Sequence, residues 1–344
     1  MIKKMSALLL CLLMVVCVSG CKLYKDTVSE PTVSQESEPE KPTYYTNPLT
    51  GVSDYTENIA LNRPVAIMIN NIKPAQSVQT GLTKADIVYE TEVEGGITRL
   101  MAVFQDVSSV SQIGSVRSAR YPYVDLALGH NAFYIHCGQD PTYCAPHLKD
   151  IEDISIDTGK FGKRIANGLS SEHTLYTFGD EIWKGIKSTF KNTTQTNAQN
   201  WQNFAGDDET VAFDGLSCQK VTVPFSNSYS TSFTYDATSG KYNRLSGSTP
   251  IKDYKTGESI SVKNVFVLLT TISDYPDGKH RRVDLVGGDG YYITNGTYTF
   301  IKWTKGSSSS SFKFTDTDGN PLKVNQGNSW VCIADKRTSN PTVQ

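Results

Sequence analysis

The sequence has little net charge and, beyond Lys3 and Lys4, no block of basic side chains. Its 33 Lys and Arg residues stand against 35 Asp and Glu, which gives a formal net charge of −2. Proteins that bind nucleic acid present a basic patch to the phosphate backbone, and this chain offers none. The composition therefore disfavours nucleic acid as a partner.

Familiar catalytic signatures are also missing. The chain contains no Gly-x-Ser-x-Gly, no His-Glu-x-x-His and no phosphate-binding Gly-rich loop, which disfavours a familiar hydrolase. His136, Cys137, Cys144 and His147 carry atoms that zinc prefers, but their spacing, Cys-x6-Cys-x2-His, matches no standard zinc pattern. We therefore predict no metal site and no cofactor.

Cysteines are few, and four of the seven remain once the N-terminal segment is set aside: Cys137, Cys144, Cys218 and Cys332. Cys137 and Cys144 are the local candidates for a disulfide in an exported protein, although a body of this size needs none. We expect reduced and mostly buried thiols.

The N-terminus has the order of a lipoprotein signal. An apolar run over 7–18 follows two lysines and is shorter than the ~20 residues that a helix needs to cross a bilayer. Ser19 and Gly20, the small pair that a lipoprotein peptidase requires, lead directly into Cys21. We predict a signal peptide over 1–20, acyl chains such as palmitate on Cys21, and anchoring at the extracytoplasmic face of a bacterial plasma membrane.

The rest of the chain divides by composition. Residues 21–48 are rich in Ser, Thr, Glu, Pro and Lys, so we expect a flexible tether. The roughly 300 residues beyond it exceed the size at which one hydrophobic core usually stops growing. We predict an α/β domain over 49–190, a connector over 191–210 and a β-rich domain over 211–338.

The order of elements in the first domain predicts a mixed sheet layered with helices. Residues 63–71 form a continuous apolar run, typical of a central strand buried on both faces. A hairpin should cover 86–105, turning at Glu94-Gly95-Gly96. A helix near 121–128, with proline in its first turn, should precede a strand over 132–137.

The second domain has short alternating runs separated by Gly, Asp and Asn, which predict a mostly antiparallel, all-β fold. These runs occupy residues 232–235, 261–269, 282–286, 290–294, 297–303, 311–314 and 329–333. The five serines after Gly306 indicate a flexible hairpin tip.

The densest group of polar residues is the loop over 114–120, between a predicted strand and the predicted helix. Arg117, Ser118 and Arg120 lie at the helix N-terminus, where unpaired backbone N–H groups and the helix dipole favour an anion. Guanidinium groups add paired hydrogen bonds to phosphate or carboxylate oxygens. Alternatively, the arginines pair with neighbouring carboxylates such as Glu94 and only stabilise the loop.

An acidic row precedes this loop. Because side chains alternate along a strand, Asp86, Glu90, Glu92 and Glu94 should share one face. Such a row is either solvated, or paired with arginines such as Arg99 on the facing strand, or able to hold a hard divalent cation.

Polar residues at strand ends complete the candidates. Asn70 and Asn71 close the central strand, where α/β sheets commonly place ligands, unless they cap a turn. His173 is either a general base or a hydrogen-bonded loop residue. The predicted ligand-binding residues are Arg99, Arg117, Ser118, Arg120, Asn70, Asn71, Glu90, Glu94 and His136.

Four long runs in the first domain, RPVAIMINN, GLTKADIVYETEVEGGITRLMAVFQ, IGSVRSARYPYVDLA and FYIHCG, carry a family resemblance. The second domain adds Tyr235-Asp236, Gly240-Lys241-Tyr242-Asn243-Arg244, Val283-Asp284-Leu285 with Gly287, and Gly327 with Trp330. Together these runs resemble the YerB-type lipoprotein family, two-domain bacterial lipoproteins whose reaction, if any, is not established. Ser115 replaces a usual proline, Cys137 a usual alanine and Ile251 a usual histidine, and the last change argues against catalysis at that position. The resemblance implies a cell-surface lipoprotein.

We expect a lipid-anchored cell-envelope protein that binds or scaffolds, with a phosphate or carboxylate site in its first domain. Its partners would be the membrane and an envelope or wall component or protein. The order of acidic strand, arginine strand and Ser-x-x-Arg loop is also similar to LytR-CpsA-Psr phosphotransferases. That likeness implies an alternative, a phosphotransferase acting on a lipid pyrophosphate or wall precursor with Mg²⁺ held by Glu90, Glu94 or Asp86. A structural spacer, with every arginine internally paired, is the third possibility.

Overall fold

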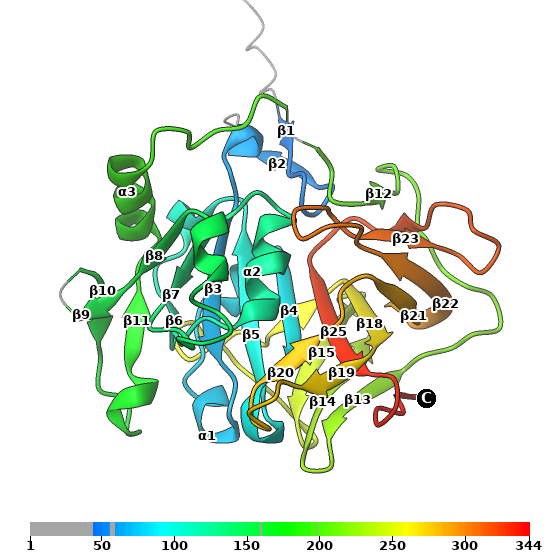
Figure 1. The fold of residues 1–344 in the computed structure, drawn as a ribbon. Coiled ribbons are helices and arrows are strands. Elements are labelled where there is room, and N and C mark those ends of the chain that lie inside the picture. Colours follow the sequence, from blue (N-terminus) through cyan, green and yellow to red (C-terminus); the bar gives the residue numbers. More distant parts are fainter. Residues whose placement is uncertain (1–43, 56–58, 159, 198) are drawn as a thin grey trace, which may run out of the picture. The chain divides into compact units, whose positions relative to one another are not determined.

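Both parts of the chain contribute to one ten-stranded sheet (Figure 1). The computed structural model describes residues 44–344 except 56–58, 159 and 198. The predictions for the signal peptide, Cys21 and most of the tether lie outside these described residues. The strand order is β23-β22-β21-β18-β25-β4-β5-β3-β7-β8.

Five strands of this sheet come from each part. The first part supplies β3 Val65–Asn70, β4 Ile87–Glu92, β5 Thr98–Phe104, β7 Phe133–His136 and β8 Asp153–Ser155. The second part supplies β18 Asn264–Thr270, β21 Gly287–Thr294, β22 Thr297–Thr304, β23 Lys313–Thr315 and β25 Ser329–Asp335. The two sets meet at β25, which lies between β18 and β4 and runs parallel to both.

The predicted elements of the first part are present. β3 is buried along its whole length, as its apolar run predicts for a strand covered on both faces. β4 and β5 form the predicted antiparallel hairpin, and its turn uses positive φ at Gly95 (70°) and Gly96 (68°). Helix α2 spans Tyr121–Leu128.

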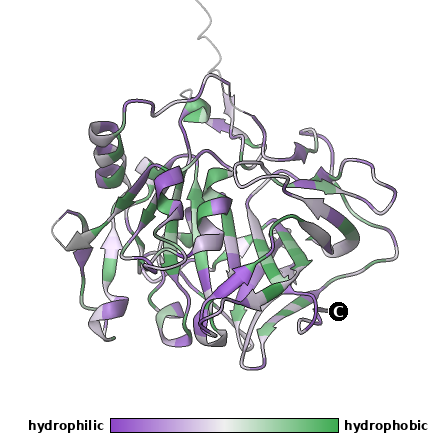
Figure 2. Cartoon of the chain, viewed as in Figure 1, coloured by the Kyte–Doolittle hydropathy of each residue, from purple (hydrophilic) through white to green (hydrophobic). Residues whose placement is uncertain are grey.

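The two faces of the long sheet are covered differently. On one face α2 packs its buried residues against β3, β4 and β5 in a shared core (Figure 1). On the other face lies a second sheet of order β16-β15-β14-β13-β26, with β17 paired to β15. Hydrophobic residues concentrate in the strands between these layers (Figure 2).

The remaining elements are shorter or peripheral. The second sheet consists of β13 Lys220–Ser226, β14 Tyr229–Asp236, β15 Lys241–Ser246, β16 Thr249–Pro250, β17 Ser261–Val262 and β26 Thr342–Val343. A four-stranded sheet contains β6 Ile113–Gly114, β9 Asp157–Thr158, β10 Phe161–Arg164 and β11 Leu175–Thr177. Three strand pairs are β1 Tyr45–Thr46 with β2 Ser53–Tyr55, β12 Asn203–Phe204 with β24 Lys323–Val324, and β19 Ile272–Asp274 with β20 Arg281–Val283. The other helices are α1 Lys73–Gln76 and α3 Gly179–Thr189.

The predicted fold class is confirmed, with a mixed, helix-covered sheet in the first part and mostly antiparallel strands in the second. The domain boundaries stay a prediction. Cys144, Cys218 and Cys332 are buried free thiols, so Cys144 forms no disulfide with Cys137. Within the described residues, no helix is both long enough and apolar enough to span a bilayer.

A polar cluster is buried where the two parts meet. Glu90, on β4, is fully buried and accepts hydrogen bonds from Trp330 Nε1 (3.0 Å), Asn71 Nδ2 (2.9 Å) and the hydroxyl of Thr231 (2.7 Å). Arg244, on β15, donates to Asn71 Oδ1 (2.6 Å) and lies 4.7 Å above the Trp330 ring. One asparagine thus links a buried anion to a buried cation. We call Glu90, Asn71, Arg244, Thr231 and Trp330 the Glu90 cluster.

This cluster predicts a large stability cost for Glu90→Ala. The substitution leaves four donors without their acceptor, the three named above and the hydroxyl of Thr98 (2.7 Å). Breaking such a buried network typically costs about 3–5 kcal/mol. We expect urea denaturation to show a loss of that size. Glu209→Ala is the matched control, because Glu209 forms an exposed ion pair with Lys323 (2.7 Å), and its midpoint should stay close to the wild type. Equal midpoints for the two variants would contradict the role of the Glu90 cluster.

Candidate functional site

The arginine loop lies where the carboxyl ends of β3 and β7 meet the start of α2. The backbone N–H of Arg117 donates to Met68 O (3.1 Å), and its carbonyl accepts from Cys137 N (3.1 Å). The loop is therefore held between the ends of two strands. Arg120, in extended conformation, then precedes the first helical turn, where Pro122 fits because its missing N–H is not needed.

Arg99 reaches this loop from the start of β5, and we call Arg99, Arg117 and Arg120 the arginine cluster. The side chain of Arg99 is only 7% exposed, and its Nη1 donates to Ser118 O (2.8 Å). Burial, together with the charges of Arg120 and Arg117, lowers the pKa of Arg99 to about 10, although Glu94 opposes the shift. No carboxylate among the described residues forms an ion pair with Arg99.

The other two arginines each have one carboxylate partner. Arg120 Nε pairs with Glu94 Oε1. Burial alone raises the pKa of Glu94, but the charge and hydrogen bond of Arg120 hold it below its usual value. Arg117 Nη2 lies 3.2 Å from Glu172 Oε2, while its Nε is buried without a hydrogen-bond partner in the described part of the chain. Ion pairing within the protein therefore accounts for Arg120 and for Arg117 in part, whereas Arg99 forms no ion pair and is only attracted by Glu94.

Asn70 lies on the arginine side of the sheet. Its Nδ2 donates to His173 Nδ1 (2.7 Å), and His173 Nε2 lies 3.5 Å from Glu172 Oε1. Asn70, His173, Glu172 and Arg117 thus form one connected chain of polar contacts. His173 is engaged on both ring nitrogens and links the end of β3 to the arginine cluster.

Asn71 and Glu90 lie apart from the arginine cluster. The hairpin register places Arg99 opposite Thr91, so Arg99 points to the face opposite that of Glu90. The same alternation separates Asn71 from Asn70. The expected meeting of Glu90 with Arg99 is therefore wrong, because it ignored which residues face each other across the hairpin.

His136 also lies outside the cluster. Its ring is buried, with Nδ1 donating to Gly138 O (2.9 Å) and Nε2 at 2.9 Å from Asp153 Oδ2. These contacts make it part of the packing at the end of β7.

The carboxylates of the acidic row do not converge. Asp86, at the start of the hairpin, accepts from Asn47 Nδ2 (2.7 Å) and Gln105 N (2.7 Å). Glu90 is satisfied in the core, and Glu94 pairs with Arg120 beyond the other end of β4. Across the described ranges no three His, Cys, Asp or Glu side chains gather as metal ligands would. The row cannot supply two carboxylates to one Mg²⁺ ion in this arrangement.

The second part of the chain reaches the edge of the arginine cluster through His280. This residue precedes β20, and its Nε2 lies 3.2 Å from Glu94 Oε1 and 3.1 Å from Asp140 Oδ1. Its Nδ1 lies 2.5 Å from Asp277 Oδ2. No local pattern predicts this contact, because its partners are distant in the chain and only the shared sheet brings them together.

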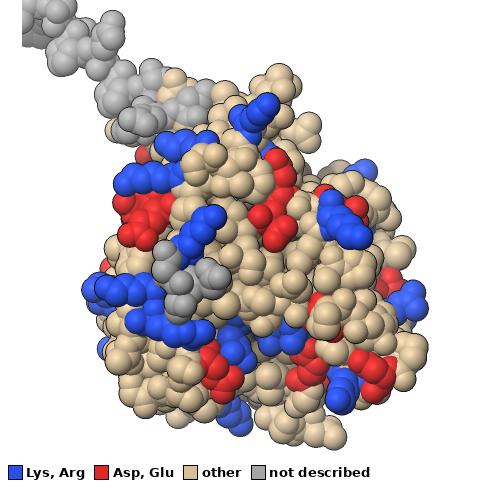
Figure 3. Space-filling model, turned by 60° about the vertical axis from the view of Figure 1, so that its left-hand side comes forward, with Lys and Arg blue, Asp and Glu red and all other residues tan. Residues whose placement is uncertain are grey.

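The charge on the surface agrees with the composition. On the face drawn in Figure 3, acidic and basic side chains are interspersed and form no extended region of one sign. Within the arginine cluster, Arg99 is nearly buried, whereas the side chains of Arg117 and Arg120 are partly exposed.

The environment of Arg99 predicts that Arg99→Met stabilises the protein. Methionine fills a similar volume without a buried charge beside two like charges, so the free energy of unfolding should rise by about 1–2 kcal/mol. Chemical denaturation at neutral pH measures this change.

Arg63→Met is the matched control for this substitution. Arg63 is also nearly buried (8% exposed), but it pairs with Glu152, donates to Asn131 O (2.9 Å) and lies 4.1 Å above the Phe133 ring. Its replacement should lower the free energy of unfolding by about 2 kcal/mol or more. A loss of stability in both variants would show that Arg99 is structurally compensated.

Comparisons with known proteins agree with this fold. Two family models match, the N-terminal domain of a protein of unknown function (DUF3048) over residues 49–194 and its C-terminal domain over 221–331. YerB of Bacillus subtilis (strain 168) is 28% identical over 268 residues, which cover 74% of this chain and 77% of YerB. The crystal structure of YerB protein from Bacillus subtilis superposes with a TM-score of 0.73 and 27% identity, covering 87% of this chain and 99% of that one. The chain therefore belongs to the DUF3048 family and contains both of its domains.

Proposed function

We propose that this protein is a lipid-anchored binding or scaffolding protein of the cell envelope, and that its arginine cluster holds an anionic group, phosphate or carboxylate. One observation carries the proposal. Arg99 is a nearly buried guanidinium with two like charges beside it. It forms no ion pair with a described residue, and the attraction of the more distant Glu94 carboxylate does not offset its burial. A buried cation without a counter-ion is costly, and a bound anion would offset that cost.

The donors available in the arginine cluster suit an oxyanion. Guanidinium groups present paired N–H donors that match the oxygens of phosphate or carboxylate. Arg99 uses one hydrogen bond to Ser118 O, and Arg117 retains a buried Nε without a partner in the described structure. The backbone N–H groups at the start of α2 add positive potential at the same end of the helix.

Anchoring by lipid is the second part of the proposal. The order of lysines, short apolar run and Ser19-Gly20-Cys21 supports it. YerB, whose name describes it as a lipoprotein, supports it through family membership.

An anion site predicts stabilisation of the purified full-length chain by pyrophosphate at constant ionic strength. At about 100 times its dissociation constant, the ligand should raise the free energy of unfolding by roughly 2.7 kcal/mol. The double variant Arg117→Ala, Arg120→Ala should lose this shift in thermal unfolding. Lys323→Ala, which removes an exposed cation paired with Glu209 in the second part of the chain, should keep it. An equal shift in the double variant would refute the site, and a shift that requires Mg²⁺ would favour the phosphotransferase instead.

Lipidation predicts that Cys21→Ser releases the chain from the membrane. The variant lacks the acylated thiol, so it should move from the membrane fraction to the soluble fraction after cell lysis and incorporate no labelled palmitate. Cys218→Ser, at a buried thiol of the folded body, is the control and should remain in the membrane fraction. Membrane retention of the Cys21 variant would contradict lipid anchoring.

A further inference from the structure

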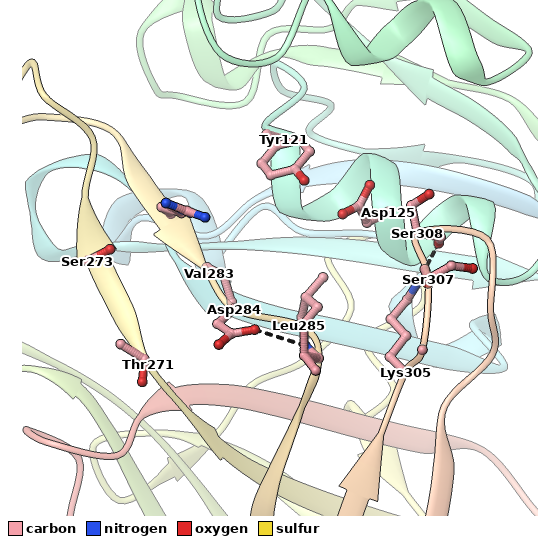
Figure 4. A pocket seen from close by; sticks show the side chains of 13 residues that line it. Tyr121, Asp125, Thr271, Ser273, Val283, Asp284, Leu285, Lys305, Ser307 and Ser308 are labelled. Carbon is pink, nitrogen blue, oxygen red and sulfur yellow. Dashed lines mark hydrogen bonds between the residues drawn. The ribbon is translucent and has the colours of Figure 1, made fainter.

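A polar pocket of about 500 Å³ lies between α2 and loops of the second part of the chain (Figure 4). Tyr121 and Asp125 face it from α2, because residues four apart lie on one side of a helix. Arg282 and Asp284 line it from β20 and the segment that follows. Lys305 lines it from the loop between β22 and β23. None of the three residues of the arginine cluster lines this pocket.

The four charged groups of the pocket form no ion pair with a described residue. Asp125 interacts with the hydroxyl of Tyr121, and Asp284 Oδ1 accepts a hydrogen bond from Val286 N (3.0 Å). The exposed side chain of Arg282 makes no hydrogen bond to a described residue.

Lys305 is buried. Its side chain is only 3% exposed and donates to the carbonyl oxygens of Ser307 (3.0 Å) and Ser308, which fixes the loop. Burial lowers the pKa of Lys305 to about 8, and burial raises the pKa of Asp125, so the pocket wall is partly dehydrated.

The mixture of groups restricts the ligand. Ionised Asp125 and Asp284 can only accept hydrogen bonds, whereas Arg282 can only donate them. A purely anionic ligand would face two carboxylates, and an apolar one would leave the Arg282 guanidinium without a hydrogen-bond partner. Hydroxyl groups both donate and accept, and neighbouring ring hydroxyls can reach both oxygens of one carboxylate.

The neutral part of the lining favours the same class. Four residues with hydroxyl side chains also line the pocket: Thr271, Ser273, Ser307 and Ser308. Leu285 and the Tyr121 ring offer apolar surface to the C–H face of a sugar ring. The volume falls in the range of small-molecule sites, ~300–1,000 Å³. A zwitterion such as a dipeptide would match Asp125 and Arg282 but leave the hydroxyl lining unused.

We propose that this pocket binds a sugar that carries an acidic group, with its ring hydroxyls on Asp125 and Asp284 and its acidic group on Arg282. The site goes beyond the anion site proposed above and does not depend on it.

The test compares D-glucuronate with D-glucose, which differ only in a carboxylate in place of a hydroxymethyl group. Binding to the full-length chain is followed by saturation-transfer NMR up to about 10 mM ligand. Both sugars should bind, glucuronate at least about tenfold more tightly, a difference typical of one added charge-assisted contact. Arg282→Gln should abolish this preference for glucuronate, and Asp125→Asn should weaken the binding of both sugars.

Two control variants and one control ligand complete the design. Arg164→Gln and Asp318→Asn change exposed residues outside the pocket and should leave both affinities unchanged. Absence of binding by both sugars, or binding that ignores Asp125 and Arg282, overturns the proposal. The control ligand is the zwitterion L-alanyl-L-alanine. If it binds in place of the sugars and its binding depends on Asp125 and Arg282, the pocket is a zwitterion site and the sugar proposal is overturned.

Discussion

The packing of the two parts of the chain against each other depends on the hydrogen bonds that the buried Glu90 carboxylate receives. A carboxylate fully buried in a sheet is tolerated only when its oxygens receive hydrogen bonds, and these come from both parts of the chain. Trp330 lies on β25 and Thr231 on β14, while Asn71 follows β3. Neither family domain contains the full set, so each is incomplete as a polar network until the other has packed against it. The contact between the two parts of the chain is therefore specific as well as hydrophobic.

Side-chain alternation directs neighbouring residues to different contacts. On one face of the long sheet, Asn71 and Glu90 build the contact between the two parts of the chain. On the other, Asn70 and Arg99 reach toward His173 and the arginine loop. The two sets of contacts are separate because consecutive side chains of a strand point to opposite faces.

Local features were predictable from sequence, and long-range ones were not. Three elements could be predicted because their physical cause is local: β3 from its apolar run, the β4–β5 turn from its glycines, and α2 from its proline. The register of that hairpin, read correctly, would also have separated Arg99 from Glu90. Nothing local indicated that β25 would pair with β4 or that His280 would reach Glu94, because both contacts join segments far apart in the chain. The composition predicted two separate domains, whereas in the structure both contribute strands to one sheet.

The position of β25 has a consequence for how the protein is made. This strand covers residues 329–335 of a 344-residue chain, yet it fills the middle of the sheet between β18 and β4. A chain that emerges N-terminus first, from a ribosome or a translocation channel, cannot close the sheet until residue 335 has been delivered. Until then β4 presents an open edge, and pairing across such a separation is intrinsically slow. A chain that ended before residue 329 would therefore lack the strand that joins the two halves of the sheet.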